Sequence, residues 1–216
     1  MRTNSCGGRI ADLGCIRKSD DFSHVNGCGV SAVGYDGYRQ IVGLEIKCDM
    51  GLPRRVPAYS AAEYLRLERA ATYRSEFYRG EIFAMAGGSP KHSRLKTNVL
   101  TELNNQLKGK PCVPFDSDLR IKCPTGLYTY PDASVICGEL EVDDEHKDTV
   151  LNPTLIVEVL SKITEAYDRG KKFDHYRTIP SLREYLLVSQ DEPMVQRFLR
   201  NDDGTWTMTA VSGMDQ

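Results

Sequence analysis

The 216-residue sequence has no run of 18 consecutive apolar residues, which argues against a transmembrane helix. Residues 1–30 lack the apolar stretch of a secretory signal peptide, so we expect a cytoplasmic protein. The seven cysteines are odd in number and include no CxxC pair, which favours reduced thiols over a disulfide framework. Because 28 basic and 30 acidic residues leave a net charge of −2, the chain is not a polycation, although a local basic face would suffice to bind nucleic acid.

Several catalytic motifs are also missing. The sequence contains no GxSxG, no GxxxxGK[ST] and no HExxH, so interpretations as a serine hydrolase, a P-loop NTPase or a zincin have no support. No cysteine lies in a recognisable nucleophile context, and Cys112, Cys123 and Cys137 resemble small core hydrophobes. The sequence therefore directs attention to other polar residues.

The composition changes along the chain. Residues 1–50 hold 8 of the 18 glycines and show no sustained helical or strand period, which predicts a poorly ordered or weakly structured N-terminal extension. Residues 57–213 show regular patterns and are long enough to bury a hydrophobic core as one domain.

Three helices are expected in this second region. Ser60 and Glu63 form an S-x-x-E capping box at the start of the first helix. The second begins at Pro90, ends at Gly109 and carries one apolar face, and the third covers 168–179. The apolar face of the second helix consists of Leu95, Val99, Leu100, Leu103 and Leu107.

Strand patterns fill the intervening segments. The run 154–161 is almost continuously apolar, which is typical of a central strand covered on both faces. In 118–123, Leu119 and Ile121 alternate with charged residues, which predicts a half-buried strand. This order of elements predicts an α/β or α+β fold, a sheet with flanking helices. The remaining strand segments are 77–87 (strand, turn, strand), 128–137, 184–188, 194–200 and 205–211.

Two carboxylates interrupt these strands. Glu158 lies within LIVEVL, where an unpaired buried charge would cost several kcal/mol, and Asp132 follows Pro131 at a predicted strand start or rim. If the two strands are neighbours, the carboxylates converge and repel each other unless a divalent cation such as Mg²⁺ or Mn²⁺ lies between them. The alternative is that Asp132 caps a turn and Glu158 pairs with a buried lysine or arginine, and the spacing alone does not decide between these interpretations.

A group of basic residues follows Glu158, from Lys162 to Arg177. On a helix, Lys172 shares a face with Asp168 and Tyr176, so one lysine could reach the carboxylates while others meet phosphates. The alternative is an ordinary solvated helix face.

These residues resemble a known family. The segments RSEFYRGEIFAMAGGSPKHSRL, YPDASVIC and NPTLIVEVLSKITEAYDRGKKFDHYRTIPSLREYLLV are similar, in this order, to the Uma-two restriction endonuclease family of the PD-(D/E)XK nuclease superfamily. The resemblance runs from about residue 57 to about residue 210 and does not include residues 1–50. It implies a restriction-endonuclease-like core with a mixed central β-sheet flanked by helices.

The resemblance also implies a site. The motif aspartate falls on Asp132 and the motif glutamate on Glu158, with the Val159 carbonyl as a further metal ligand and Glu81 completing the acidic set. Glu76 is the runner-up for Glu81. The superfamily lysine would stand at position 160, which is Leu160 here, and the family pattern places it instead at Lys172 on the following helix. Lys171 could compete, but adjacent helical residues point about 100° apart, so only one can face the site.

The implied activity is Mg²⁺- or Mn²⁺-dependent hydrolysis of phosphodiester bonds, with DNA as the expected partner and a homodimer as a possible assembly. The second hypothesis is a nucleic-acid-binding or interaction protein without catalysis, because a fold does not establish a function and Leu160 departs from the superfamily pattern. Basic residues near the site are expected to contact nucleic acid: Lys91, His92, Arg94, Lys162 and Lys171.

Overall fold

The computed structural model describes residues 28–30, 46–48, 58–85, 87–143 and 146–213. The chain divides into two compact units, Met1–Arg55 and Val56–Gln216. In the first unit, the short strands β1 (Cys28–Val30) and β2 (Ile46–Cys48) pair antiparallel. The rest of the predicted N-terminal extension lies outside the described residues, and everything below concerns the second unit.

The second unit begins with helix α1 (Ala61–Ala70) and the hairpin of β3 (Ser75–Tyr78) and β4 (Glu81–Ala84). The predicted capping box is present: the Glu63 amide donates to Ser60 Oγ over 3.2 Å, and the Ser60 amide donates to Glu63 Oε2 over 2.8 Å. Arg79 and Gly80 both have positive φ, at 48° and 89°, as a tight hairpin turn of the right twist requires.

The larger sheet has six strands in the order β13-β12-β11-β10-β8-β5. All neighbours are antiparallel except β10 and β11, so the sheet is mixed, as expected. The predicted central strand is confirmed, because β10 lies between β8 and β11 and is almost entirely buried. The strands are β5 (Cys112–Asp116), β8 (Ala133–Cys137), β10 (Leu155–Val159), β11 (Glu184–Val188), β12 (Met194–Arg200) and β13 (Trp206–Ser212).

A smaller five-stranded sheet, which the sequence patterns did not predict as a separate sheet, has the order β4-β3-β7-β6-β9. Its further strands are β6 (Arg120–Lys122), β7 (Tyr128–Thr129) and β9 (Thr149–Val150). The segment expected to form one strand from 128 to 137 is divided between β7 in this sheet and β8 in the larger one, and Pro131 lies between them.

The expected exposure of Arg120, on strand β6, is wrong. Alternation predicted that Arg120 would face solvent, but it is only 3% exposed. It donates to Thr149 Oγ1, Tyr130 Oη and Asp148 Oδ1 over 2.7–2.9 Å, so its burial is compensated by three hydrogen bonds.

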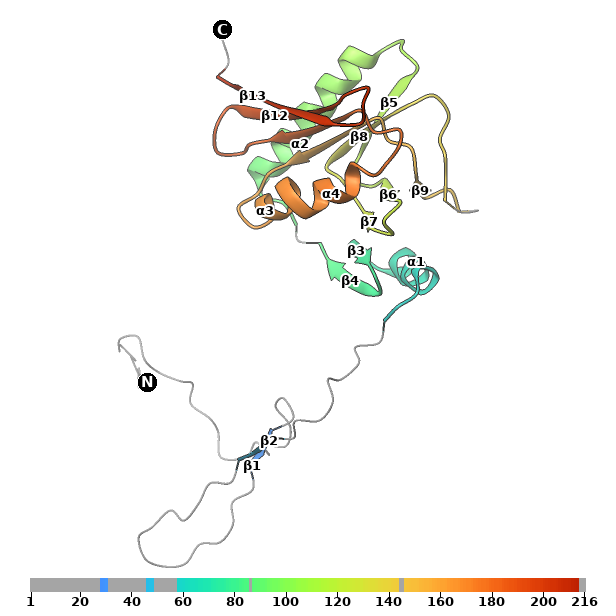
Figure 1. The fold of residues 1–216 in the computed structure, drawn as a ribbon, viewed down its shortest axis with the longest axis vertical. Coiled ribbons are helices and arrows are strands. Elements are labelled where there is room, and N and C mark those ends of the chain that lie inside the picture. The colour runs from blue at the N-terminus through green and yellow to red at the C-terminus, as the bar shows by residue number, and fades with distance from the viewer. Residues whose placement is uncertain (1–27, 31–45, 49–57, 86, 144–145, 214–216) are drawn as a thin grey trace, which may run out of the picture. The chain divides into compact units, whose positions relative to one another are not determined.

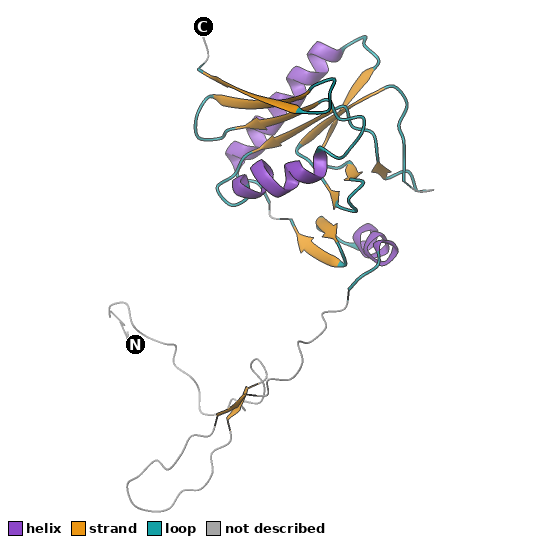
Figure 2. Cartoon of the chain, in the orientation of Figure 1, coloured by secondary structure: helices purple, strands orange, loops and turns teal. Residues whose placement is uncertain are grey.

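Helices cover the larger sheet (Figures 1 and 2). Helix α2 (Pro90–Leu107) contacts β5, β8 and β10, and its predicted apolar residues are half-buried. The segment predicted as one helix over 168–179 consists of α3 (Glu165–Tyr167), a π-helical turn (Asp168–Lys172) and α4 (Phe173–Tyr176). Within the described residues, no helix is both long and apolar enough to cross a membrane.

The main core lies between β10, β11 and the α4 segment. Tyr176 and Phe173 pack against Tyr185, with ring centroids 5.4 Å apart in both pairs. Alternate residues of β10 point to opposite faces, so Ile156 and Leu160, which belong to this core, share a face with Glu158. This geometry directs Glu158 toward the π-helical turn.

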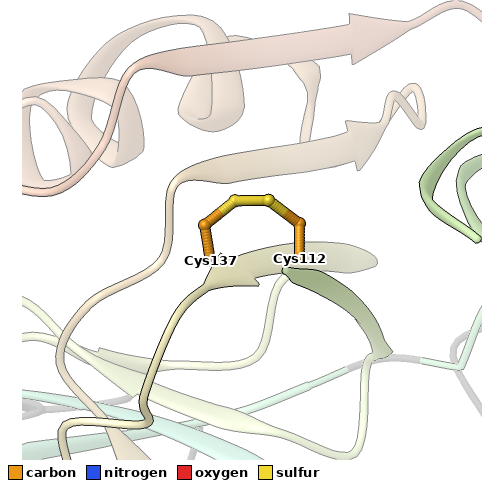
Figure 3. Close-up of a disulfide and its surroundings, with 2 residues drawn as sticks. All are labelled: Cys112 and Cys137. Atoms are coloured by element: carbon orange, nitrogen blue, oxygen red, sulfur yellow. A yellow bond between two sulfur atoms is a disulfide. The ribbon is translucent and has the colours of Figure 1, made fainter. Parts of the chain in front are cut away.

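The expectation of reduced thiols is wrong for two cysteines. Cys112 and Cys137 form a disulfide that joins β5 and β8 (Figure 3). The two residues are direct partners in the antiparallel register, with Cα atoms 3.9 Å apart, a proximity that their separation of 25 residues in the sequence conceals. Cys123, in contrast, is a buried free thiol, as its sequence context suggested.

We expect reduction of this disulfide to lower the free energy of unfolding by about 2–4 kcal/mol, because the bond restricts the unfolded chain. Chemical unfolding of the wild type with and without reductant measures the loss. A Cys112→Ser/Cys137→Ser variant is the control. Its unfolding midpoint should equal that of the reduced wild type and should not change when reductant is added. A wild-type unfolding midpoint that does not change on reduction would contradict the presence of the disulfide.

Candidate functional site

The two carboxylates singled out in the sequence lie on neighbouring strands. β8 and β10 pair with Val157 opposite Ala133, which brings Asp132, directly before β8, opposite Glu158. The Val159 amide donates to Asp132 Oδ2 over 2.8 Å, and the Asp132 amide lies 3.4 Å from Glu158 Oε2. The backbone of each strand therefore fixes the carboxylate of the other.

Lys172 completes this arrangement from the π-helical turn. Its Nζ lies 2.8 Å from Glu158 Oε1, 3.4 Å from Glu76 Oε1 and 3.6 Å from Asp168 Oδ1, and all four residues are buried. The sequence left open whether Glu158 converges with a second carboxylate or pairs with a buried basic residue. In the structure it does both, because it faces Asp132 and is paired with Lys172. We call the four carboxylates Glu76, Asp132, Glu158 and Asp168 the acidic cluster.

The helical segment explains why Lys172 and not Lys171 reaches the cluster. Lys171 is exposed, while Lys172 is 5% exposed. Tyr185 Oη donates to the Asp168 carbonyl over 2.9 Å, and Tyr176 Oη donates to Glu158 Oε1 over 2.8 Å. The first bond attaches the π-helical turn to β11 and the second attaches α4 to β10. π-helical turns occur frequently at functional sites.

Burial and mutual repulsion raise the pKa values of two carboxylates in the acidic cluster, Glu158 and Asp168. Burial, followed by the charges of Asp132 and Asp168, raises the pKa of Glu158 to about 8, although Lys172 opposes this shift. Burial also raises the pKa of Asp168. For Lys172, burial acts to lower the pKa, but Glu158, Glu76 and Asp168 together raise it well above its usual value, so the ammonium stays charged. One lysine therefore faces more negative charge than it can balance.

His92 lies beside Asp132. It belongs to the first turn of α2, whose N-cap Ser89 accepts a hydrogen bond from the His92 amide over 3.1 Å. His92 Nε2 is 3.1 Å from Asp132 Oδ2, and this hydrogen bond raises the pKa of the imidazole against the opposing effect of burial. The helix start thus holds a polar ring against one of the two central carboxylates.

The acidic cluster opens into a cavity of about 820 Å³ between the ends of β8 and β10 and the start of α2. The cavity is lined by six carboxylate residues and only three lysines, so its charge is predominantly negative. The acidic residues are Glu76, Asp132, Glu158, Glu165, Asp168 and Asp191, and the basic ones are Lys91, Lys162 and Lys172.

The donor atoms fit a hard divalent cation. Among the residues that the structure describes, no three His, Cys, Asp or Glu side chains form a ready-made metal cluster. Magnesium does not need one, because it commonly binds through one or two carboxylates and completes its shell with water and substrate phosphates. Asp132 and Glu158, facing each other in a cavity with excess negative charge, provide such a pair.

The structure brings some predicted residues to the cavity and leaves others out. Lys91, His92 and Lys162 line it, whereas Arg94 and Lys171 are exposed and do not. Glu81 is also exposed, on β4, and lines a different cavity.

The runner-up Glu76 takes the place expected for Glu81. It lies on β3, accepts hydrogen bonds from Thr129 Oγ1 and Tyr167 Oη, and faces Lys172. Sequence patterns offer no ground for choosing Glu76 beyond its nearness to the motif, because the two glutamates share one face of the hairpin and differ in which strand is the sheet edge. The sequence indicates Asp168 only as a helical neighbour of Lys172, although its burial makes it part of the cluster.

A mixed sheet with helices packed on it and two carboxylates facing each other on adjacent strands defines a restriction-endonuclease-like fold. A solved structure from Anabaena variabilis ATCC 29413, described as "a putative nuclease belonging to DUF820", matches this chain with a TM-score of 0.58. The match covers 72% of this chain and 85% of the other at 20% identity, which supports the fold alone.

The family follows from sequence comparison. The profile of Uma2, described as "Putative restriction endonuclease", matches residues 61–216, and the chain belongs to this family. Two relatives from Synechocystis sp., "Uncharacterized protein slr1290" and "Uncharacterized protein sll1609", are each 40% identical to it. The matches cover 74% and 71% of this chain and 84% and 88% of the relatives.

Proposed function

We propose that the protein is a metal-dependent endonuclease that hydrolyses phosphodiester bonds of DNA. The observation that carries the proposal is the convergence of Asp132 and Glu158 from adjacent strands, with the ammonium of Lys172 2.8 Å from Glu158. Asp132, Glu158 and the Val159 carbonyl would hold Mg²⁺ or Mn²⁺. When bound, such an ion lowers the pKa of water, polarises the phosphoryl group and stabilises the leaving oxygen.

The chain's own groups have separate roles in this proposal. Lys172, charged and held by three carboxylates, provides positive charge beside the position where negative charge develops on the phosphate. The backbone contacts between β8 and β10 keep Asp132 and Glu158 oriented without further ordering during the reaction. Lys91 and Lys162, both exposed at the cavity, contact backbone phosphates on either side.

A second candidate is a nucleic-acid-binding protein without catalytic activity. The observation that favours it is the ion pair between Glu158 and Lys172, which already gives the buried glutamate a partner without a metal. The two candidates differ in what the carboxylate pair does with a divalent ion, because a non-catalytic protein has no need to bind one.

Metal binding therefore tests the proposed function. We expect saturating Mn²⁺ to stabilise the wild type, by about 2.7 kcal/mol when the free ion is a hundred times its Kd. Asp132→Asn should lose this stabilisation, and the matched control Asp191→Asn, an exposed carboxylate in the same cavity, should keep it. Calorimetric titration and thermal unfolding measure both effects. Equal responses of the two variants would assign the metal effect to general cavity charge and contradict the proposed ligands.

A further inference from the structure

Two exposed apolar side chains lie on the wall of the acidic cavity. Phe83, on β4, is 47% exposed, and Ile163, between β10 and α3, is 88% exposed. Isolated exposed apolar residues are common on protein surfaces. These two, however, line the cavity into which the acidic cluster opens, where phosphates and metal ions gain nothing from contact with them.

The hairpin fixes Phe83 beside the acidic cluster. Phe83 is the direct antiparallel partner of Glu76, so the two side chains lie on the same face of the hairpin, with Cα atoms about 5 Å apart. Glu76 Oε1 is in turn 3.4 Å from Lys172 Nζ. Phe83 also lines the neighbouring cavity of about 630 Å³, together with the exposed rings of Tyr59 and Tyr73. An aromatic surface therefore continues outward from the acidic cluster.

A short turn holds Ile163 in its exposed position. The Thr164 amide donates to the Ser161 carbonyl over 3.1 Å, and the hydroxyl groups of the two residues lie 2.9 Å apart. This turn follows β10 directly, so Ile163 lies a few residues beyond Glu158 and next to Lys162. The side chain is thus presented by a hydrogen-bonded turn at the same end of β10 as the carboxylate pair.

We propose that Phe83 and Ile163 contact nucleobases on the two sides of the cleaved phosphate, so that the substrate is a DNA strand whose bases are unstacked at the point of cleavage. This inference rests on the proposed function and names its substrate class. Aromatic rings stack on single-stranded bases of any sequence, and isoleucine is one of the apolar side chains that wedge between base steps. Because the cavity carries few cations, these contacts contribute affinity that phosphate attraction does not supply.

The test compares strands with and without bases. The three probes are a single-stranded oligodeoxynucleotide, the same strand with abasic residues at its centre, and the matched duplex. The strand has about 15 nucleotides, which is within the usual range of binding sites. Affinities are measured by fluorescence anisotropy with Ca²⁺, a hard divalent cation, replacing Mg²⁺. We expect the wild type to bind the base-bearing single strand more tightly than the other two probes.

Phe83→Ala should weaken binding of the base-bearing strand roughly 5- to 100-fold, as expected for loss of one stacked base, and Ile163→Ala should weaken it less. Neither variant should change binding of the abasic strand, and Phe83→Trp should restore the affinity. Val211→Ala, an exposed apolar truncation on β13 away from the cavity, is the control. Lys162→Gln should weaken binding to base-bearing and abasic strands alike, because it removes a phosphate contact.

The outcomes separate the two proposals. If the wild type cleaves DNA and the Phe83 and Ile163 variants bind all probes as the wild type does, the base contacts are wrong and the nuclease assignment stands. Equal losses for base-bearing and abasic strands also overturn the base contacts. A wild type that neither binds nor cleaves any of the probes overturns both proposals.

Discussion

Asp132→Asn and Glu158→Gln are each expected to lower the rate of Mg²⁺-dependent DNA cleavage roughly a thousandfold or more, because a metal supplies several kcal/mol of charge stabilisation in the transition state. Both substitutions preserve the shape of the side chain. The carboxamide oxygen introduced at position 132 would still accept from the Val159 amide, and the one at position 158 from the Tyr176 hydroxyl, so the fold should remain. Steady-state cleavage of a supercoiled plasmid, with folding checked by circular dichroism, measures the effect.

Two controls make this result interpretable. Asp191→Asn removes a carboxylate from the same cavity without touching the acidic cluster and should leave cleavage within a few-fold of the wild type. Glu81→Gln should behave similarly, since the structure places Glu81 on an exposed position of β4 outside the cavity. Undiminished cleavage by a highly purified Asp132→Asn/Glu158→Gln protein would refute the assignment.

Lys172→Met is expected to destabilise the fold by about 3–5 kcal/mol, because it leaves buried carboxylates without their cation. For a domain of this size, that loss corresponds to a decrease in Tm of roughly 6–20 °C. Lys171→Met is the matched control, since Lys171 is the adjacent residue and is exposed. Its Tm should stay within about 2 °C of the wild type, as is usual for surface substitutions.

The destabilisation should depend on pH in a defined direction. The folded-state pKa of Glu158, about 8, lies above its reference value of 4.5, so protonation of Glu158 favours the folded state. Its favourable contribution is complete below about pH 4.5 and is lost as the pH rises through about 8. Removing Lys172 raises this pKa further, so the stability deficit of Lys172→Met should be larger at neutral to alkaline pH than in mild acid. A deficit that is the same at both would show that the lysine acts through packing and not through charge.

The sequence was most informative where a pattern extended over many residues. The continuous apolar run of 154–161 identified β10 as a central strand, and a single glutamate within it pointed to the candidate site. The capping box at Ser60 and the apolar face of α2 identified two helices for the same reason, because local hydrogen bonds and periodicity are sufficient to specify them.

The errors arose where distant segments decide the outcome. Cys112 and Cys137 become partners only through the register of β5 and β8, which no local pattern encodes. Arg120 is buried because Asp148, Tyr130 and Thr149 surround it. Glu76 and Glu81 lie on the same face of the β3–β4 hairpin. Glu76 is the one beside Lys172 because β3 pairs with β7 inside the sheet whereas β4 is the edge strand, and no local pattern encodes that order.

The position of the ammonium has one further consequence. Leu160, where the superfamily pattern expects lysine, is buried among core residues, and the positive charge comes from a separate helical segment joined to the sheet by the tyrosine contacts described above. The charge constellation therefore exists only while that segment is docked. Because the same segment also carries Phe173 and Tyr176 of the main core, opening it would cost a large part of the free energy of global unfolding, so the lysine and the carboxylates are held together as firmly as the core itself.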